Sequence, residues 1–450
     1  MALRSSLLPG LASCLLLIAC GSRSRLLEPP QGTGAAGTGA SGGGGAGGFG
    51  GGFGGGGFGG GGFGGAGGSV GGFGGVGGSS CSSLANLVPV IHVESSGASD
   101  TFPKLTRSMS DGSQLTLGLM RTDTATGWRE ILHASFLPWM SWPLDPLQPT
   151  FSSFKSPELD PAFASGPSTD DHLGLLVSHD LVASFAATVT ANASNPGPNV
   201  TLSNTGSAIF VSYSQSAHLV ANSSGMTLMG HVVNAGLGVA DFTLACGLGV
   251  NVADATPFEN GWIVALANEP TAPTTGCSAA ANGTSRLDLL RVGLDATPTL
   301  LTNLELGVPI SSIRVAPYSK GAWVVWRVAS GGVVAPIQAL RLDASSGELL
   351  GPFDVSQPGD LPLDGFDASS IGDDLVVAWG NDPANNPPDL TLSVFGSFGL
   401  VTQTSFEPGF FGPLAVEGTQ SGVVVAWQNN SAVGPFSQIE LTRFDCFGAL

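Results

Sequence analysis

Residues 422–427 read Gly-Val-Val-Val-Ala-Trp, a turn residue followed by a β-branched run that ends on a large aromatic. Three earlier stretches are similar: GAWVVW at 321–326, DLVVAW at 374–379 and GWIVAL at 261–266, which ends on Leu266 instead of an aromatic. Because β-branched and aromatic residues favour strands, each stretch predicts one buried strand. Their first residues lie 60, 53 and 48 positions apart, which indicates an internal repeat of roughly 50 residues.

A second strand is predicted after each of these stretches. The segments are LDLLRV at 287–292, IQALRLD at 337–343, LTLSVF at 390–395 and IELTRFD at 439–445. Apolar and polar residues alternate in each of them, as is typical of a half-buried strand. Two strand signals in register, repeated four times, predict a repeated all-β unit.

A unit of roughly 50 residues with several short strands is typical of a β-propeller blade. The roughly 367 residues from 84 to 450, divided by this period, predict about seven blades, with six as the alternative. We expect Trp326, Trp379 and Trp427 to pack between blades. The alternative for these indoles is an aromatic platform that binds sugars.

The first half of the predicted propeller repeats less clearly. Residues 180–185 and 208–213 fit the frame of the 422–427 stretch, but they lie too close together for one whole unit. Residues 111–119 and 128–134 indicate a further pair of strands. The exact frame of the repeat is therefore open before about residue 250.

The N-terminus has the features of an export signal. Arg4 precedes a mostly apolar run, residues 7–19, which is too short for a comfortable membrane span. The run ends Leu17-Ile18-Ala19-Cys20, which resembles the lipobox of bacterial lipoproteins. This resemblance implies a signal peptide at 1–19, removed together with Cys14, and lipidation of Cys20. The alternative is an ordinary secretory signal with a chance cysteine.

Residues 20–80 are expected to form a disordered linker. No charged residue occurs from Gly32 to Ser80, where glycine is interrupted by phenylalanines every four or five positions. So little apolar surface does not offset the entropy of ordering glycines. A coil of about 50 such residues reaches roughly 40 Å. The phenylalanines are interpreted as slippage of a repetitive coding sequence, with weak cohesive contacts as the alternative. The predicted propeller domain then covers 81–450.

The formal net charge of −18 bears on the partners. A surface of this sign repels phosphate backbones, so we expect no nucleic-acid partner. The expected partners are the membrane, through lipid at Cys20, and a protein or glycan ligand. We expect a monomer in the cell envelope, at the outer membrane or cell surface rather than the inner membrane.

Four cysteines remain after the signal peptide and lipidation site: Cys81, Cys246, Cys277 and Cys446. An even number outside the cytoplasm favours disulfides. The strand at 439–444 is the third of its blade, so the fourth must come from the N-terminal end, around residues 87–93. That closure predicts a Cys81–Cys446 disulfide and leaves Cys246 to pair with Cys277. The alternative is free, buried thiols.

No motif of established chemistry occurs in the chain, and we predict no catalytic residue, no cofactor and no metal site. Two acidic groups are the exceptions considered. Asp170 and Asp171 lie near His172 and His179, where a metal or acid–base site would be possible. Five aspartates could suit calcium: Asp360, Asp364, Asp367, Asp373 and Asp374.

Taken together, the chain resembles the propeller-like repeat proteins found among exported bacterial lipoproteins. The resemblance is good over about 250–450 and poor over 100–250. The tether, the repeats and the lack of a catalytic constellation predict a lipid-anchored binding or scaffold protein of unknown ligand, and an enzyme is less favoured. The alternative is a polysaccharide-directed hydrolase or lyase that uses carboxylates on a propeller scaffold.

Overall fold

Every helix or strand that the computed structural model describes is a β-strand. The structure describes residues 81–86, 91–93, 99–107, 115–123, 128–136, 152–156, 159–165, 172–179, 184–190, 199–203, 208–215, 217–223, 227–246, 252–268, 285–329, 336–356, 362–381, 389–397, 399–406, 413–419, 422–429 and 438–448. All of these residues belong to one compact unit, Gly68–Leu450. Among them, no helix is long and apolar enough to cross a membrane.

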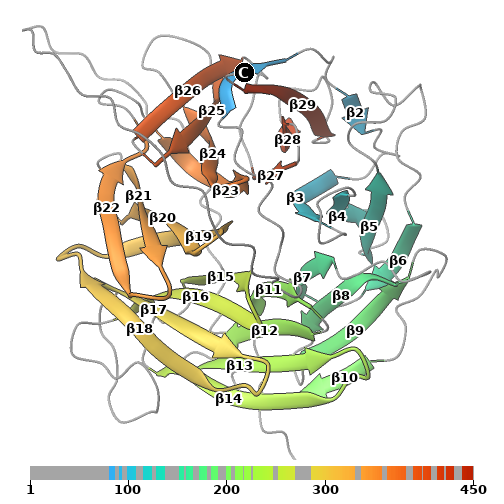
Figure 1. The fold of residues 1–450 in the computed structure, drawn as a ribbon. Helices are drawn as coiled ribbons and strands as arrows, with labels where there is room; N and C mark the ends of the chain where they lie inside the picture. The colour runs from blue at the N-terminus through green and yellow to red at the C-terminus, as the bar shows by residue number, and fades with distance from the viewer. Residues whose placement is uncertain are drawn as a thin grey trace, which may run out of the picture. The chain divides into compact units, whose positions relative to one another are not determined.

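The described strands form seven antiparallel sheets, which we number as blades 1 to 7 (Figure 1). Blade 1 consists of β3 (Ser99–Arg107), β4 (Leu115–Asp123), β5 (Trp128–Phe136) and β6 (Ser152–Ser156). Blade 2 consists of β7 (Leu159–Ser165), β8 (His172–His179), β9 (Ser184–Thr190) and β10 (Asn199–Leu202). Blade 3 consists of β11 (Ala208–Ser214), β12 (Ala217–Ser223), β13 (Thr227–Asn234) and β14 (Val239–Cys246). Blade 4 consists of β15 (Ala253–Phe258), β16 (Gly261–Asn268), β17 (Arg286–Gly293) and β18 (Pro298–Glu305). Blade 5 consists of β19 (Ile310–Tyr318), β20 (Gly321–Val328), β21 (Ile337–Asp343) and β22 (Glu348–Asp354). Blade 6 consists of β23 (Pro362–Ile371), β24 (Asp374–Asn381), β25 (Asp389–Gly396) and β26 (Gly399–Phe406). Blade 7 consists of β27 (Leu414–Gly418), β28 (Gly422–Asn429), β29 (Gln438–Gly448) and the N-terminal strands β1 (Cys81–Ala85) and β2 (Ile91–Val93).

The blades close into a ring, as a propeller requires. The first strand of each blade lies beside the first strand of the next, from β3 through β7, β11, β15, β19 and β23 to β27. β27 in turn lies beside β3, so the circle is complete (Figure 1). The predicted all-β propeller and its seven blades are therefore confirmed, and the six-blade alternative is wrong.

The repeated stretches at 261, 321, 374 and 422 are the second strands of blades 4 to 7. All eight residues of β16 are buried, because neighbouring blades cover both of its faces. A strand covered on both sides can be apolar throughout, which explains the unbroken hydrophobic runs. The outermost strand β18 is instead largely exposed.

The glycine that starts most of these second strands is required by close packing. A Cβ on Gly261, Gly321 or Gly422 would lie 2.1–2.2 Å from a carbonyl oxygen of the adjacent third strand. Real Cβ atoms do not approach so closely, so a side chain would push the two strands apart. Asp374 occupies the same position in blade 6, and its carboxylate has a separate use described below.

The tryptophans form the core between blades, as predicted. Trp326 packs in the cluster between blades 4 and 5, Trp379 between blades 5 and 6, and Trp427 between blades 6 and 7. All three are fully buried. A sugar cannot reach them, so the binding-platform alternative is wrong.

The N-terminal strands complete blade 7. β1 pairs with the last part of β29 and β2 with its first part, so both serve as the fourth strand. Cys81 and Cys446 form a disulfide with a Cα–Cα distance of 5.3 Å, as predicted. The fourth strand was predicted around 87–93, whereas the structure places it at 81–85 and 91–93. In Figure 1 the blue strand β1 lies beside the dark red β29.

Cys246 is also disulfide-bonded. Its predicted partner, Cys277, lies outside the described residues, and so do Cys14 and Cys20. The Cys246–Cys277 pairing and the lipidation therefore stay predictions.

The frame predicted for the first half needs correction. Of residues 180–185 only Ser184 and Phe185 are described, and they begin β9, the third strand of blade 2. Residues 208–213 do form a strand, but it is β11, the first strand of blade 3. The predicted pair at 111–119 and 128–134 corresponds to β4 and β5, which are paired.

Candidate functional site on the innermost strands

Polar side chains recur at two levels of the innermost strands in blades 4 to 7. At the first level Asp254, Arg314 and Asp367 lie opposite Ala265, Val325 and Ala378 of the second strands. At the second level Thr256, Ser369 and Glu417 lie opposite Ile263, Val376 and Val424. We name these six residues the axial row, because the innermost strands surround the axis of the ring.

The axial row satisfies backbone groups on the open edge of the next blade. Asp254 accepts a hydrogen bond from the Val315 amide at 2.8 Å, and Asp367 accepts one from the Val416 amide at 2.9 Å. An innermost strand has no neighbour on its axial side, so its N–H groups there need other acceptors. A carboxylate from the preceding blade supplies them.

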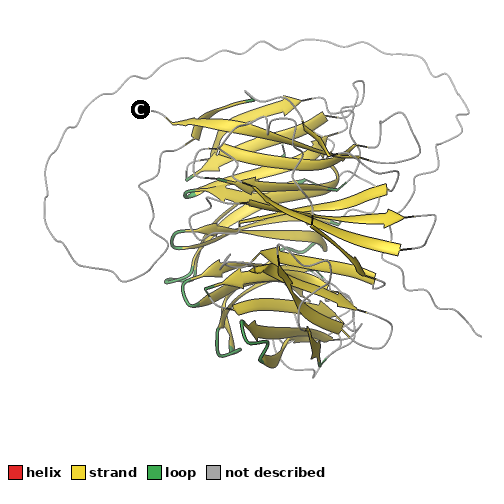
Figure 2. Cartoon of the chain, turned by 90° about the vertical axis from the view of Figure 1, so that its right-hand side faces the viewer, coloured by secondary structure: helices red, strands yellow, loops and turns green. Residues whose placement is uncertain are grey.

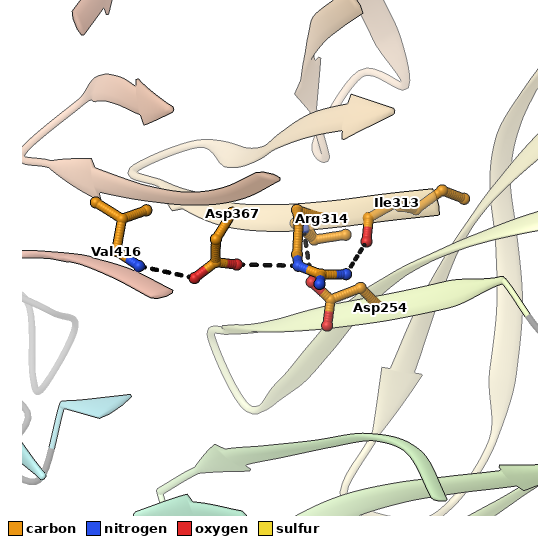
Figure 3. Close-up of polar contacts among 6 residues, drawn as sticks. Asp254, Ile313, Arg314, Asp367 and Val416 are labelled. Atoms are coloured by element: carbon orange, nitrogen blue, oxygen red, sulfur yellow. Dashed lines mark hydrogen bonds and ion pairs between the residues drawn. The ribbon is translucent and has the colours of Figure 1, made fainter. Parts of the chain in front are cut away.

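Arg314 and Asp367 form an ion pair between blades 5 and 6 (Figure 3). The Arg314 Nε donates to Asp367 Oδ1 at 2.9 Å, and its Nη1 donates to the Ile313 carbonyl at 2.8 Å. The guanidinium carbon lies 5.7 Å from the centre of the Phe366 ring. Arg314 is 38% exposed and Asp367 only 10%, so the pair is screened on one side.

The second level of the axial row joins blades 6 and 7. The Ser369 hydroxyl donates to Glu417 Oε1 at 2.8 Å and accepts from the Gly418 amide at 3.0 Å. These bonds hold the Ser369 hydroxyl and the Glu417 carboxylate in fixed positions. Sequence reasoning missed this row, since an isolated Asp or Ser in a strand has no local signal.

The predicted acidic groups are divided among different places. Asp373 accepts hydrogen bonds from the Ser319 amide and hydroxyl, both at 3.0 Å, whereas Asp367 belongs to the axial row. Asp374 accepts from the Cys81 amide at 3.3 Å, and burial raises its pKa. Asp360 and the side chain of Asp364 lie outside the described residues. Within the described part, no three His, Cys, Asp or Glu residues gather as metal ligands do.

The histidine group is only partly described. Asp170, Asp171 and the side chains of His172 and His179 lie outside the described residues. The two histidines are the first and last residues of β8, an eight-residue strand. Their backbones are therefore roughly 23 Å apart along the strand, and the metal or acid–base site stays a prediction.

A buried histidine in blade 3 was not anticipated from the sequence. Nδ1 of His231 lies 2.6 Å from Asp241 Oδ1, and Nε2 lies 2.9 Å from Asn222 Oδ1. Burial lowers the pKa of His231, and the Asp241 carboxylate partly offsets this. The imidazole is fully buried whereas the Asp241 side chain is 36% exposed, and the trio holds three adjacent strands together.

The two rims of the ring differ. One rim, the hairpin rim, holds the connections from first to second and from third to fourth strands, such as the two residues between Phe258 and Gly261. The opposite rim holds the connections from second to third strands, which are the longer ones in blades 4 to 7, such as the one between Asn268 and Arg286. Most of the green turns in Figure 2 lie along one side. Cys81 belongs to the hairpin rim, because it lies opposite Gly448 at the end of β29.

Comparison with known proteins yields likeness of fold only. No family model matches the sequence, and no curated protein matches it. A solved protein of unknown function from Dyadobacter fermentans is 14% identical, with a TM-score of 0.43, over 81% of this chain and 99% of that chain. The WD40 domain of coronin from Toxoplasma gondii is 7% identical, with a TM-score of 0.46, over 81% and 89%. TolB from Acinetobacter baumannii is 13% identical, with a TM-score of 0.37, over 66% and 63%. The propeller assignment rests on the seven sheets of this chain and on their arrangement in a closed ring.

Proposed function

We propose that this chain is a lipid-anchored binding or scaffold protein of the cell envelope, held outside the cytoplasm by an acyl group on Cys20. The observation that carries the proposal is the closed ring whose first strand starts at a disulfide, Cys81–Cys446. Disulfides persist in oxidising compartments, which agrees with the export signal. A ring fastened at the residue where the linker ends is suited to presentation on a tether.

The axial row favours binding or scaffolding over catalysis. The carboxylates of the axial row, Asp254, Asp367 and Glu417, all accept hydrogen bonds from an adjacent blade. A general acid or base has to exchange its proton with a substrate, and these groups are engaged in holding blades together. We therefore assign them a structural role and rank the polysaccharide hydrolase or lyase second.

The anchor is tested by metabolic labelling with an alkyne analogue of palmitate in a bacterial host. We expect the full chain to be labelled and to partition into detergent, and the Cys20→Ala variant to be neither labelled nor membrane-bound. Cys14→Ala is the matched control and should behave as the full chain does. Equal labelling of the Cys20→Ala variant would overturn the lipid anchor.

Ligand binding is tested with the detergent-solubilised full chain on a glycan array and in pull-downs from envelope fractions. We expect a retained glycan or protein, and no release of sugar products from the polysaccharides offered. Product release abolished by Asp254→Asn or Glu417→Gln would instead establish the hydrolase or lyase. Neither binding nor product would contradict both functions.

A further inference from the structure

We propose that the Cys81–Cys446 disulfide is a mechanical clamp that carries tension on the N-terminal linker past β1 and directly into β29. The inference deepens the proposed function, since it takes the linker as a tether under load. A ligand bound to the ring and a lipid anchor at the other end of the linker would pull on Cys81. The place where this pull enters the sheet decides whether the ring stays closed.

Without the disulfide, β1 would be the weakest point of attachment. It is five residues long, pairs only with β29, and has two exposed residues. It runs antiparallel to β29, and the linker joins it at its first residue. Tension would therefore separate the pairs one after another, from Cys81 towards Ala85. An edge strand that opens stepwise has little local stability.

The disulfide moves the load to a longer strand with more pairs. Cys446 lies in β29, which has 11 residues; it directly follows the eight residues, Gln438 to Asp445, that pair with β28. Cys81 is the first residue of β1, so the covalent bond comes before any pair that could peel. The bond joins residues separated by 365 positions, so nearly the whole ring lies inside the covalent loop.

Further contacts fasten the same residue to the neighbouring blade. Cys81 is fully buried in the cluster between blades 6 and 7, and its amide donates to Asp374 of blade 6. The next residue, Ser82, donates to the Phe447 carbonyl at 2.7 Å. Asp374 stands where blades 4, 5 and 7 have a tightly packed glycine, so the repeat departs from its pattern at the point that meets the linker.

Single-molecule pulling tests the clamp. The full chain would carry azide-bearing amino acids at Ser80 and at Lys320, which is exposed in a turn of blade 5. For the oxidised protein we expect no extension before the ring itself unfolds. For Cys446→Ser we expect an early step at lower force of about 2–4.5 nm, because peeling frees 5 residues of β1 or 13 residues to the end of β2 at about 3.5 Å each.

Two controls separate the clamp from general destabilisation. Cys246→Ser removes the other disulfide and should show no early step. The unmutated protein under mild reductant should show the step, which covers the case in which Cys446→Ser fails to fold. Identical first events in oxidised and reduced protein would overturn the clamp. Handles at Ser80 need no lipid, so this result is independent of the labelling of Cys20.

Discussion

Replacing Trp379 with Phe should destabilise the ring less than replacing Trp323 with Phe. Both indoles are buried in the same cluster between blades 5 and 6, at 0% and 1% exposure. They differ in what their N–H groups meet. The Trp323 Nε1 donates to the Asp373 carbonyl at 2.9 Å. Within the described part of the chain, the Trp379 Nε1 is buried with no acceptor.

The expected difference follows from this contrast. Each change from indole to phenyl removes a similar volume, so the cavity terms are similar. At Trp323 the change also deletes a hydrogen bond with a net worth of about 0.5–1.5 kcal/mol. At Trp379 it deletes an unsatisfied buried donor, which relieves about 1–3 kcal/mol. The Trp379→Phe variant should therefore be about 1.5–4.5 kcal/mol more stable than Trp323→Phe.

A neighbouring cation adds to the contrast in the same direction. The Arg341 guanidinium lies 5.5 Å from the centre of the Trp323 ring, and indole binds a cation better than phenyl does. Urea unfolding followed by far-UV circular dichroism measures both variants, with the free energy of unfolding taken from the linear dependence on urea. An equal loss at the two sites, or a larger loss at Trp379, would refute the reasoning.

Three further predictions concern the polar contacts. Asp367→Ala should cost about 2–3 kcal/mol, because it leaves a buried backbone N–H unpaired, whereas Arg314→Ala should cost less than about 1 kcal/mol; urea unfolding compares them. Burial raises the pKa of Asp374, so its ionisation lowers stability as the pH rises from the ordinary value of 3.8 through the folded value. Asp374→Asn should flatten this dependence, as measured by melting temperature against pH. Burial lowers the pKa of His231, so the neutral ring contributes stability above pH 6.5 that is lost as the pH falls through the folded value. Asp241→Asn removes a carboxylate that raises this pKa, so NMR titration of the ring should place it lower still.

The fold could be predicted wherever burial leaves a local pattern. The second strands of blades 4 to 7 are covered on both faces, so runs such as 422–427 are apolar throughout. The third strands alternate, and the last of them was expected to pair with a strand from the N-terminal end, as β29 does with β1 and β2. That single deduction also predicted the Cys81–Cys446 disulfide.

The prediction was wrong where a local pattern does not show which strand of a blade a segment forms. Residues 208–213 fit the frame of a second strand but form β11, the first strand of blade 3. Periodicity does not distinguish one buried strand of a blade from another. The frame of blades 2 and 3 therefore depended on pairing partners that the local pattern does not reveal.

The sequence by itself determined the repeat and favoured about seven blades and the cysteine pair that closes the ring, because these follow from the spacing of strands along the chain. Only the tertiary structure decided the axial row and the buried His231 trio. The hydrogen bond between Asp254 and Val315 joins residues 61 positions apart in the sequence, and the one between Arg314 and Asp367 joins residues 53 positions apart. Such polar contacts depend on how one blade is placed against the next, and no local pattern of residues encodes that placement.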